Sequence, residues 1–93
     1  MNLEEISWIS ISKSQNSDMR CVSCHDNVEE MMHHRQVGEK VGYKVERKYA
    51  VMRDSSGIVL GLADDYVNGN MSLGTLDEMV SPFLYNREHR GSE

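Results

Sequence analysis

The sequence predicts an α+β fold built on a small antiparallel sheet. We expect a central β-hairpin over residues 42–63, covered on one face by two short helices at about 27–37 and 76–85. Two observations predict this class. Apolar side chains alternate along VGYKVERKYAV, as in a strand, and recur every three or four positions near the C-terminus, as in an amphipathic helix. The 93 residues suit one small domain, 1–93.

A first strand is expected in ISWISIS, because β-branched and aromatic residues fill this segment. Its apolar side chains fall on both parities: Ile6 and Trp8 share one, and Ile9 and Ile11 share the other. Either both faces of this strand are covered, or a bulge changes its register.

Capping residues predict where the two helices begin. Asp26 can cap the helix at 27–37, with Glu29 reaching back to complete a capping box. Thr75 can do the same for the helix at 76–85, which Pro82 should kink or shorten. The polar segment that follows, 86–93, is expected to be a frayed tail.

The central hairpin is predicted from its turn. Asp54 and Gly57 carry the residue preferences of a type I turn, placed between a strand at 42–53 and an apolar run at 58–63. Asn68 and Gly69 mark a further tight turn, which either leads to another strand or ends a short helix.

The net charge of -5 argues against nucleic acid as the main partner, because neutralising phosphates needs a basic surface. One local basic run fits a solvated strand face; it comprises Lys40, Lys44, Arg47 and Lys48. No stretch has the roughly 20 apolar residues that span a bilayer, so no membrane association is expected. Without a secretory signal in this sequence, we expect a cytoplasmic protein, although a mature exported chain would look the same.

The segment CVSCH contains both cysteines of the chain, Cys21 and Cys24, followed directly by His25. In these five residues the chain resembles a c-type cytochrome, whose haem is attached through CxxCH. The resemblance implies that the two thiols hold the vinyl groups of haem c and that His25 binds the iron. Met71, which precedes the last helix, would be the sixth ligand, and the function would be electron transfer or haem sensing.

A zinc site is a second interpretation of the same segment. Cys21 and Cys24 could present two thiolates to one tetrahedral ion, and the helix that follows carries His33 and His34. Neighbouring residues point about 100° apart on a helix, so only one of these two histidines is expected to bind. The remaining ligand would come from a histidine or a carboxylate, with the candidates His25, His89, Glu29 and Glu30.

Two further interpretations of the cysteines stay open. A dithiol redox centre also uses Cys-x-x-Cys, at a helix N-terminus whose dipole lowers the thiol pKa. Alternatively, the two cysteines simply pack as small apolar side chains.

Together these patterns predict a small cytoplasmic module, supplemented by zinc, that binds a protein partner in a regulatory role. We expect docking on exposed strand edges or acidic helix faces, and homo-oligomers could also form through the sheet edges. A c-type haem protein is the alternative function. A thiol-redox protein is the second alternative and the only one that would be an enzyme; the zinc module would not be one.

Overall fold

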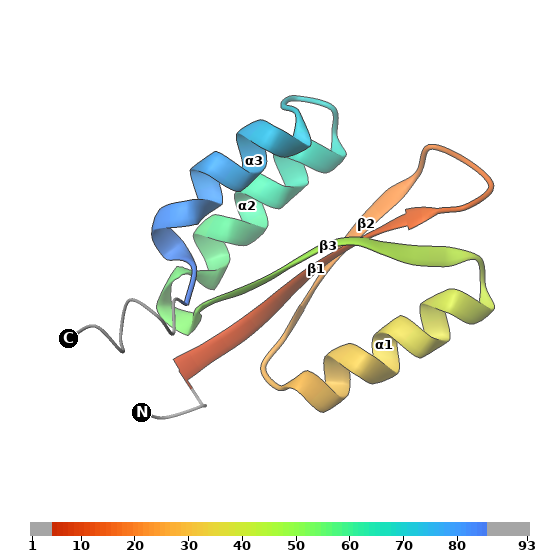
Figure 1. The fold of residues 1–93 in the computed structure, drawn as a ribbon, viewed down its shortest axis with the longest axis horizontal. Coiled ribbons are helices and arrows are strands. Elements are labelled where there is room, and N and C mark those ends of the chain that lie inside the picture. Colours follow the sequence, from red (N-terminus) through yellow and green to blue (C-terminus); the bar gives the residue numbers. More distant parts are fainter. Residues whose placement is uncertain (1–4, 86–93) are drawn as a thin grey trace.

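The computed structural model describes residues 5–85 and shows a three-stranded antiparallel sheet with helices on both faces (Figure 1). The strands are β1 (Ile6–Ser14), β2 (Arg20–His25) and β3 (Tyr43–Met52), arranged in the order β2-β1-β3. The helices are α1 (Val28–Lys40), α2 (Ser56–Val67) and α3 (Leu73–Val80), with short 3-10 turns at Arg53–Ser55 and Ser81–Phe83. The predicted α+β class and antiparallel sheet are therefore confirmed.

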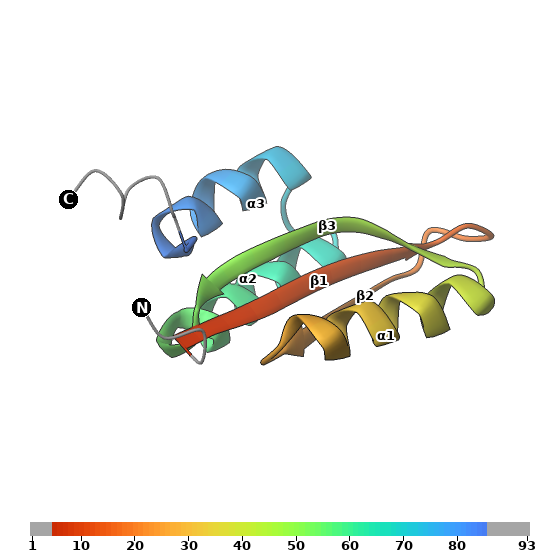
Figure 2. The same ribbon diagram turned by 60° about the horizontal axis from the view of Figure 1, so that its bottom comes forward.

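The two faces of the sheet are covered by different helices, and Figure 2 shows α1 and α3 on opposite sides. On the α2 and α3 side lies a cluster of buried side chains, comprising Ile9, Ile11, Tyr49, Val51, Val59, Ala63, Leu76 and Val80. On the α1 side β1 presents serines, and Met31 is the one buried residue of the helix. The prediction that both helices cover one face was wrong, because β1 is covered on both of its faces.

The second strand of the predicted hairpin, 58–63, is instead part of helix α2. Val59 and Ala63 are four positions apart and both are fully buried, which is the spacing of a helix face turned to the sheet. A run of six apolar-rich residues is too short for its periodicity to distinguish a strand from a helix. The prediction therefore depended on the turn expected at 54–57, which wrongly indicated a hairpin. The partner of β3 in the sheet is β1.

Helix α1 confirms the helix predicted at 27–37, with a different cap. The side chain of Asn27, rather than that of Asp26, accepts a hydrogen bond of 2.8 Å from the backbone N–H of Glu30. After the helix, Gly42 takes a φ of +90°, a left-handed conformation that favours glycine, and the chain turns into β3.

Helix α3 starts three residues before the predicted boundary at 76. Its cap is Ser72, whose hydroxyl accepts a hydrogen bond of 3.1 Å from the N–H of Thr75. The helix ends at Val80, and Pro82 lies in the 3-10 turn that follows, so the expected shortening by proline is confirmed. The tail predicted at 86–93 lies outside the described residues.

The register of β3 shifts by one residue at Glu46. Ile11 of β1 pairs with Arg47, whereas the next residue of β1 pairs with Val45, so Glu46 is the extra residue of a bulge. Its carboxylate accepts hydrogen bonds from Arg20 of β2, at 2.9 Å, and from the hydroxyl of Tyr66 of α2, at 2.7 Å. The bulge thus ties together three elements.

Within residues 5–85, no helix has the length and apolar character needed to cross a membrane.

Candidate functional site

The segment CVSCH forms most of strand β2. Residues that pair across an antiparallel sheet share a face. Cys21 pairs with Ser12 of β1, on the α1 side, whereas Cys24 pairs with Ile9, which belongs to the buried cluster on the α2 and α3 side. Because side chains alternate along a strand and the two cysteines are an odd number of positions apart, their thiols point to opposite faces of the sheet.

This direction restricts what the two thiols can do together. Three residues of extended strand span about 10 Å, whereas the Cα atoms of a disulfide lie within about 7 Å of one another. Two sulfurs on one zinc ion lie about 4 Å apart. Cys21 and Cys24 are both free and exposed. While β2 is paired as a strand, they can neither close a disulfide with each other nor share one metal ion.

The structure brings two of the candidate ligands together. The rings of His25, at the end of β2, and His34, on α1, have centroids 5.1 Å apart. The Nε2 atom of His25 also shares a hydrogen bond of 2.9 Å with the hydroxyl of Ser23. Since β2 continues as a strand to His25, the histidine lies on the α1 face together with Cys21, four residues away.

The other candidate ligands lie elsewhere. His33, Glu29 and Glu30 are exposed on α1, and Met71 packs against the cluster on the other face, so the sheet separates it from His25. His89 is outside the described residues. Within 5–85, no group of three or more histidine, cysteine, aspartate or glutamate side chains is placed to hold a metal ion. The zinc and haem sites stay predictions, and the observed geometry does not assemble them.

The pKa values of two residues in CVSCH are shifted by their surroundings. Partial burial lowers the pKa of His25, and the neighbouring His34 lowers it further, against the opposing effect of Glu30. Partial burial also raises the pKa of the Cys24 thiol, with a further contribution from the charge of Asp26. A raised pKa leaves less thiolate at neutral pH, which does not suit the nucleophile of a redox dithiol.

A polar cluster beside Cys24 fixes the end of β2. The hydroxyl of Ser7 donates a hydrogen bond of 3.2 Å to the carboxylate of Asp26. Arg53 donates from Nη2 to the backbone carbonyls of Ile6, at 2.9 Å, and of Asp26, at 3.1 Å. These contacts join the start of β1, the link from β2 to α1 and the turn after β3, so their role is structural.

Strand β2 forms one edge of the sheet. The backbone N–H of Ser14 donates to the carbonyl of Met19 at 2.9 Å, which fixes the phase of the alternating hydrogen bonds between β1 and β2. By this alternation, Cys21 and Ser23 direct their backbone groups to β1. The backbone groups of Arg20, Val22 and Cys24 point outward, and no strand of the described part of the chain pairs with them.

The opposite edge, along β3, is protected in ways that β2 is not. The N–H of Tyr85 donates to the carbonyl of Ala50 at 2.8 Å, and Leu84 forms a β-bridge with Val51. Further along β3 stand Lys48 and the bulge at Glu46, two features that keep sheet edges from pairing with other chains.

Arg20 is the charged side chain of β2 that could prevent another strand from pairing with this edge, but it is held by contacts within the molecule. The guanidinium of Arg20 is bound by Glu46 and lies over the ring of Tyr66, at 5.3 Å from its centroid. Sequence reasoning expected exposed edges without saying which one was open, because the partners of each strand are set by tertiary pairing. No protein-family model, curated protein or solved structure matches this chain.

Proposed function

We propose that this chain is a protein-interaction module that binds an extended segment of a partner protein as an additional strand along β2. The observation that carries the proposal is the row of outward backbone groups at Arg20, Val22 and Cys24, which have no pairing strand in the described structure. Strand addition at an open edge supplies affinity through backbone hydrogen bonds, and side-chain contacts on the two faces supply specificity.

The surroundings of β2 favour a basic partner segment. Two exposed glutamates, Glu29 and Glu30, follow the strand closely, whereas the carboxylate of Asp26 is already paired with Arg53 at 3.5 Å. The whole chain carries a net charge of -5. Lysine and arginine side chains on the incoming strand would therefore be attracted to this end of β2, which would speed association and fix the direction of the partner.

A binding role is preferred over thiol-redox chemistry at Cys24, because the raised pKa of this thiol opposes its use as a nucleophile. We also propose a cytoplasmic, regulatory setting. Its support is that Cys21 and Cys24 are both free and exposed, which suits a reducing compartment.

The test uses peptides selected from a random library for binding to the full chain. We expect extended, basic peptides, and we expect them to slow hydrogen exchange at the amides of Val22 and Cys24. Cys24→Pro removes one outward N–H and places the proline ring on the edge, without breaking the ladder to β1. Its matched control is Cys24→Ala, which removes the thiol alone.

We expect Cys24→Pro to weaken peptide binding by about tenfold or more, because an outward hydrogen bond is lost and the ring obstructs the edge, whereas Cys24→Ala binds as the unmodified chain does. Circular dichroism verifies that both variants are folded. Equal binding by Cys24→Pro would overturn the proposal, as would protection that maps away from β2. Sedimentation showing that a second copy already occupies the edge would also exclude a separate partner.

A zinc ion is a second candidate, and one observation favours it: the pairing of His25 with His34 at 5.1 Å. Two imidazoles bound to one zinc ion bring their ring centres to about 5 Å, given zinc–nitrogen distances near 2 Å. We propose that any bound zinc uses this histidine pair, with neither cysteine as a ligand. Glu30 and Asp26 are the candidates for a further ligand, since the charges of both carboxylates act on the pKa of His25.

Zinc titration of two neighbouring variants tests this candidate. His34→Ala should reduce zinc affinity at least about tenfold, because a ligand is lost, whereas His33→Ala on the same helix should leave it unchanged. Cys21→Ala and Cys24→Ala should likewise retain zinc. Equal affinity in the two histidine variants, or loss of zinc from either cysteine variant, would exclude the histidine pair as the site.

A further inference from the structure

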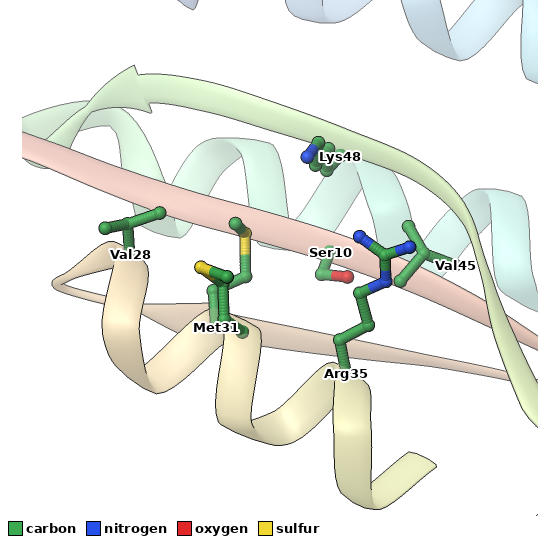
Figure 3. A pocket seen from close by; sticks show the side chains of 7 residues that line it. Ser10, Val28, Met31, Arg35, Val45 and Lys48 are labelled. Atoms are coloured by element: carbon green, nitrogen blue, oxygen red, sulfur yellow. The ribbon is translucent and has the colours of Figure 1, made fainter. Parts of the chain in front are cut away.

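A cavity of about 160 Å³ lies between α1 and the sheet, on the face opposite the buried cluster (Figure 3). Its floor includes Ser10 of β1, which is 3 % exposed. Ser10 therefore places one hydroxyl in the lining of the cavity, where it can donate or accept a hydrogen bond with a ligand.

The walls of this cavity are apolar. Val28, Met31 and Met32 of α1 line it together with Val45 of β3. Met32 and Val28 are also among the large apolar side chains that remain exposed, at 53 % and 43 %. Methionine is flexible and polarisable, which lets such a wall adapt to an apolar ligand.

Two cations border the cavity, Arg35 from α1 and Lys48 from β3. Figure 3 shows the Arg35 side chain reaching from the helix toward Ser10 and Val45. Its ion pair with Glu39 is long, at 3.9 Å, and exposed, so the guanidinium is available to another anion. Lys48 forms no ion pair with any residue of the described part of the chain. Two weakly compensated cations beside an apolar cavity are notable in a chain with a net charge of -5.

We propose that this cavity binds a small carboxylate with a compact apolar body, of the size of an aromatic ring or a short aliphatic chain. A cavity of about 150 Å³ in another protein holds benzene, so the volume here fits a body of that size. The apolar body lies between the methionines of α1 and Val45. The carboxylate binds the guanidinium of Arg35, which suits its planar geometry, with Lys48 as the second cation. This site is separate from the β2 edge and does not rest on strand binding.

Benzoate is the probe, and its neutral analogue benzamide is the matched ligand. In the full chain labelled at the methionine methyl groups, we expect benzoate to shift the Met31 and Met32 methyl resonances in a saturable way. Benzamide should bind at least about tenfold more weakly, because it cannot form the charged contact to Arg35. Inorganic phosphate at the same concentration should not displace benzoate, because it lacks the apolar body.

Two variants locate the charged contact. Arg35→Gln should weaken benzoate binding about tenfold or more and leave benzamide binding unchanged, because only the carboxylate contact is removed. Lys13→Gln is the control. Lys13 lies opposite Arg20 in the register of β1 and β2, so its side chain is on the α2 face of the sheet and not on the face with the cavity. Equal binding of benzoate and benzamide, displacement by phosphate, or shifts confined to other methionines would each overturn the proposal.

Discussion

The thiols of Cys21 and Cys24 diverge because side chains in a strand alternate with a period of two. The same spacing in a tight turn or at a helix start would bring the thiols together, which is why CxxC alone predicts a shared site. The conformation of four residues therefore decides whether these thiols act as a pair or singly. His25, by contrast, lies beside the ring of His34 on α1, and the sequence left open whether His33 or His34 would take that place.

Oxidation of the folded chain should leave Cys21 and Cys24 unlinked to each other. With a thiol oxidant, we expect the monomer to retain two alkylatable thiols in the folded state and to form the internal disulfide only in urea, because about 10 Å of strand separates the two Cα atoms. Mass spectrometry of the alkylated monomer measures this difference. Rapid loss of both thiols from the folded monomer would show that residues 21–24 are not held in a strand.

The elements that could be predicted from the sequence are those whose own residues favour a strand or cap a helix. The strands at 6–14 and 43–52 carry dense β-branched and aromatic residues, and α1 and α3 carry caps within their own sequence. Helix α2 was missed because its identity depends on burial of Val59 and Ala63 against the sheet. The strand β2 was missed because its small, polar side chains carry little β signal, and only pairing with β1 defines it.

The bulge at Glu46 joins β2, β3 and α2 through its carboxylate. The hydrogen bond from Arg20 is the main reason that the pKa of Glu46 is lowered, with the Tyr66 hydroxyl contributing. A lowered pKa in the folded state stabilises the fold above the ordinary glutamate pKa, about 4.3. This stabilisation is lost as the pH falls below that value and through the lower pKa of the folded state.

Glu46→Gln should therefore reduce the free energy of unfolding by about 1–2 kcal/mol at pH 7, and by less near pH 3, which is below the ordinary glutamate pKa, so that the carboxylate of the unfolded chain is protonated. Urea denaturation at both pH values measures the effect. Glu39→Gln is the control, because its ion pair with Arg35 is exposed and should contribute little at either pH. A loss that is equal at both pH values would show that charge on Glu46 is not the cause.

Across the whole molecule, the sheet separates a densely packed side from a lightly packed one. The α2 and α3 side holds the cluster that includes fully buried Leu76 and Val80, whereas α1 contributes Met31 alone as a buried residue and leaves a cavity beneath it. This asymmetry places stability on one face and a binding cavity on the other. Cavities that bind ligands are commonly found where packing between elements is incomplete.

The two faces should respond differently to truncation. Leu76→Ala should cost about 2–5 kcal/mol, because a fully buried side chain leaves a cavity that its neighbours cannot fill. Met31→Ala should cost less, toward about 2 kcal/mol, because the flexible wall beside it can collapse. Denaturant unfolding of both variants measures the difference. Equal costs would show that α1 is as tightly packed as α3.

Amide hydrogen exchange along β2 tests most directly whether this strand is paired on one side only. In the isolated chain we expect slow exchange at Cys21 and Ser23, whose N–H groups point to β1, and fast exchange at Val22 and Cys24, whose N–H groups point outward. Slow exchange at all four amides would mean that the edge is already covered. Fast exchange at all four would mean that CVSCH is not a strand, and the docking proposal would fail with it.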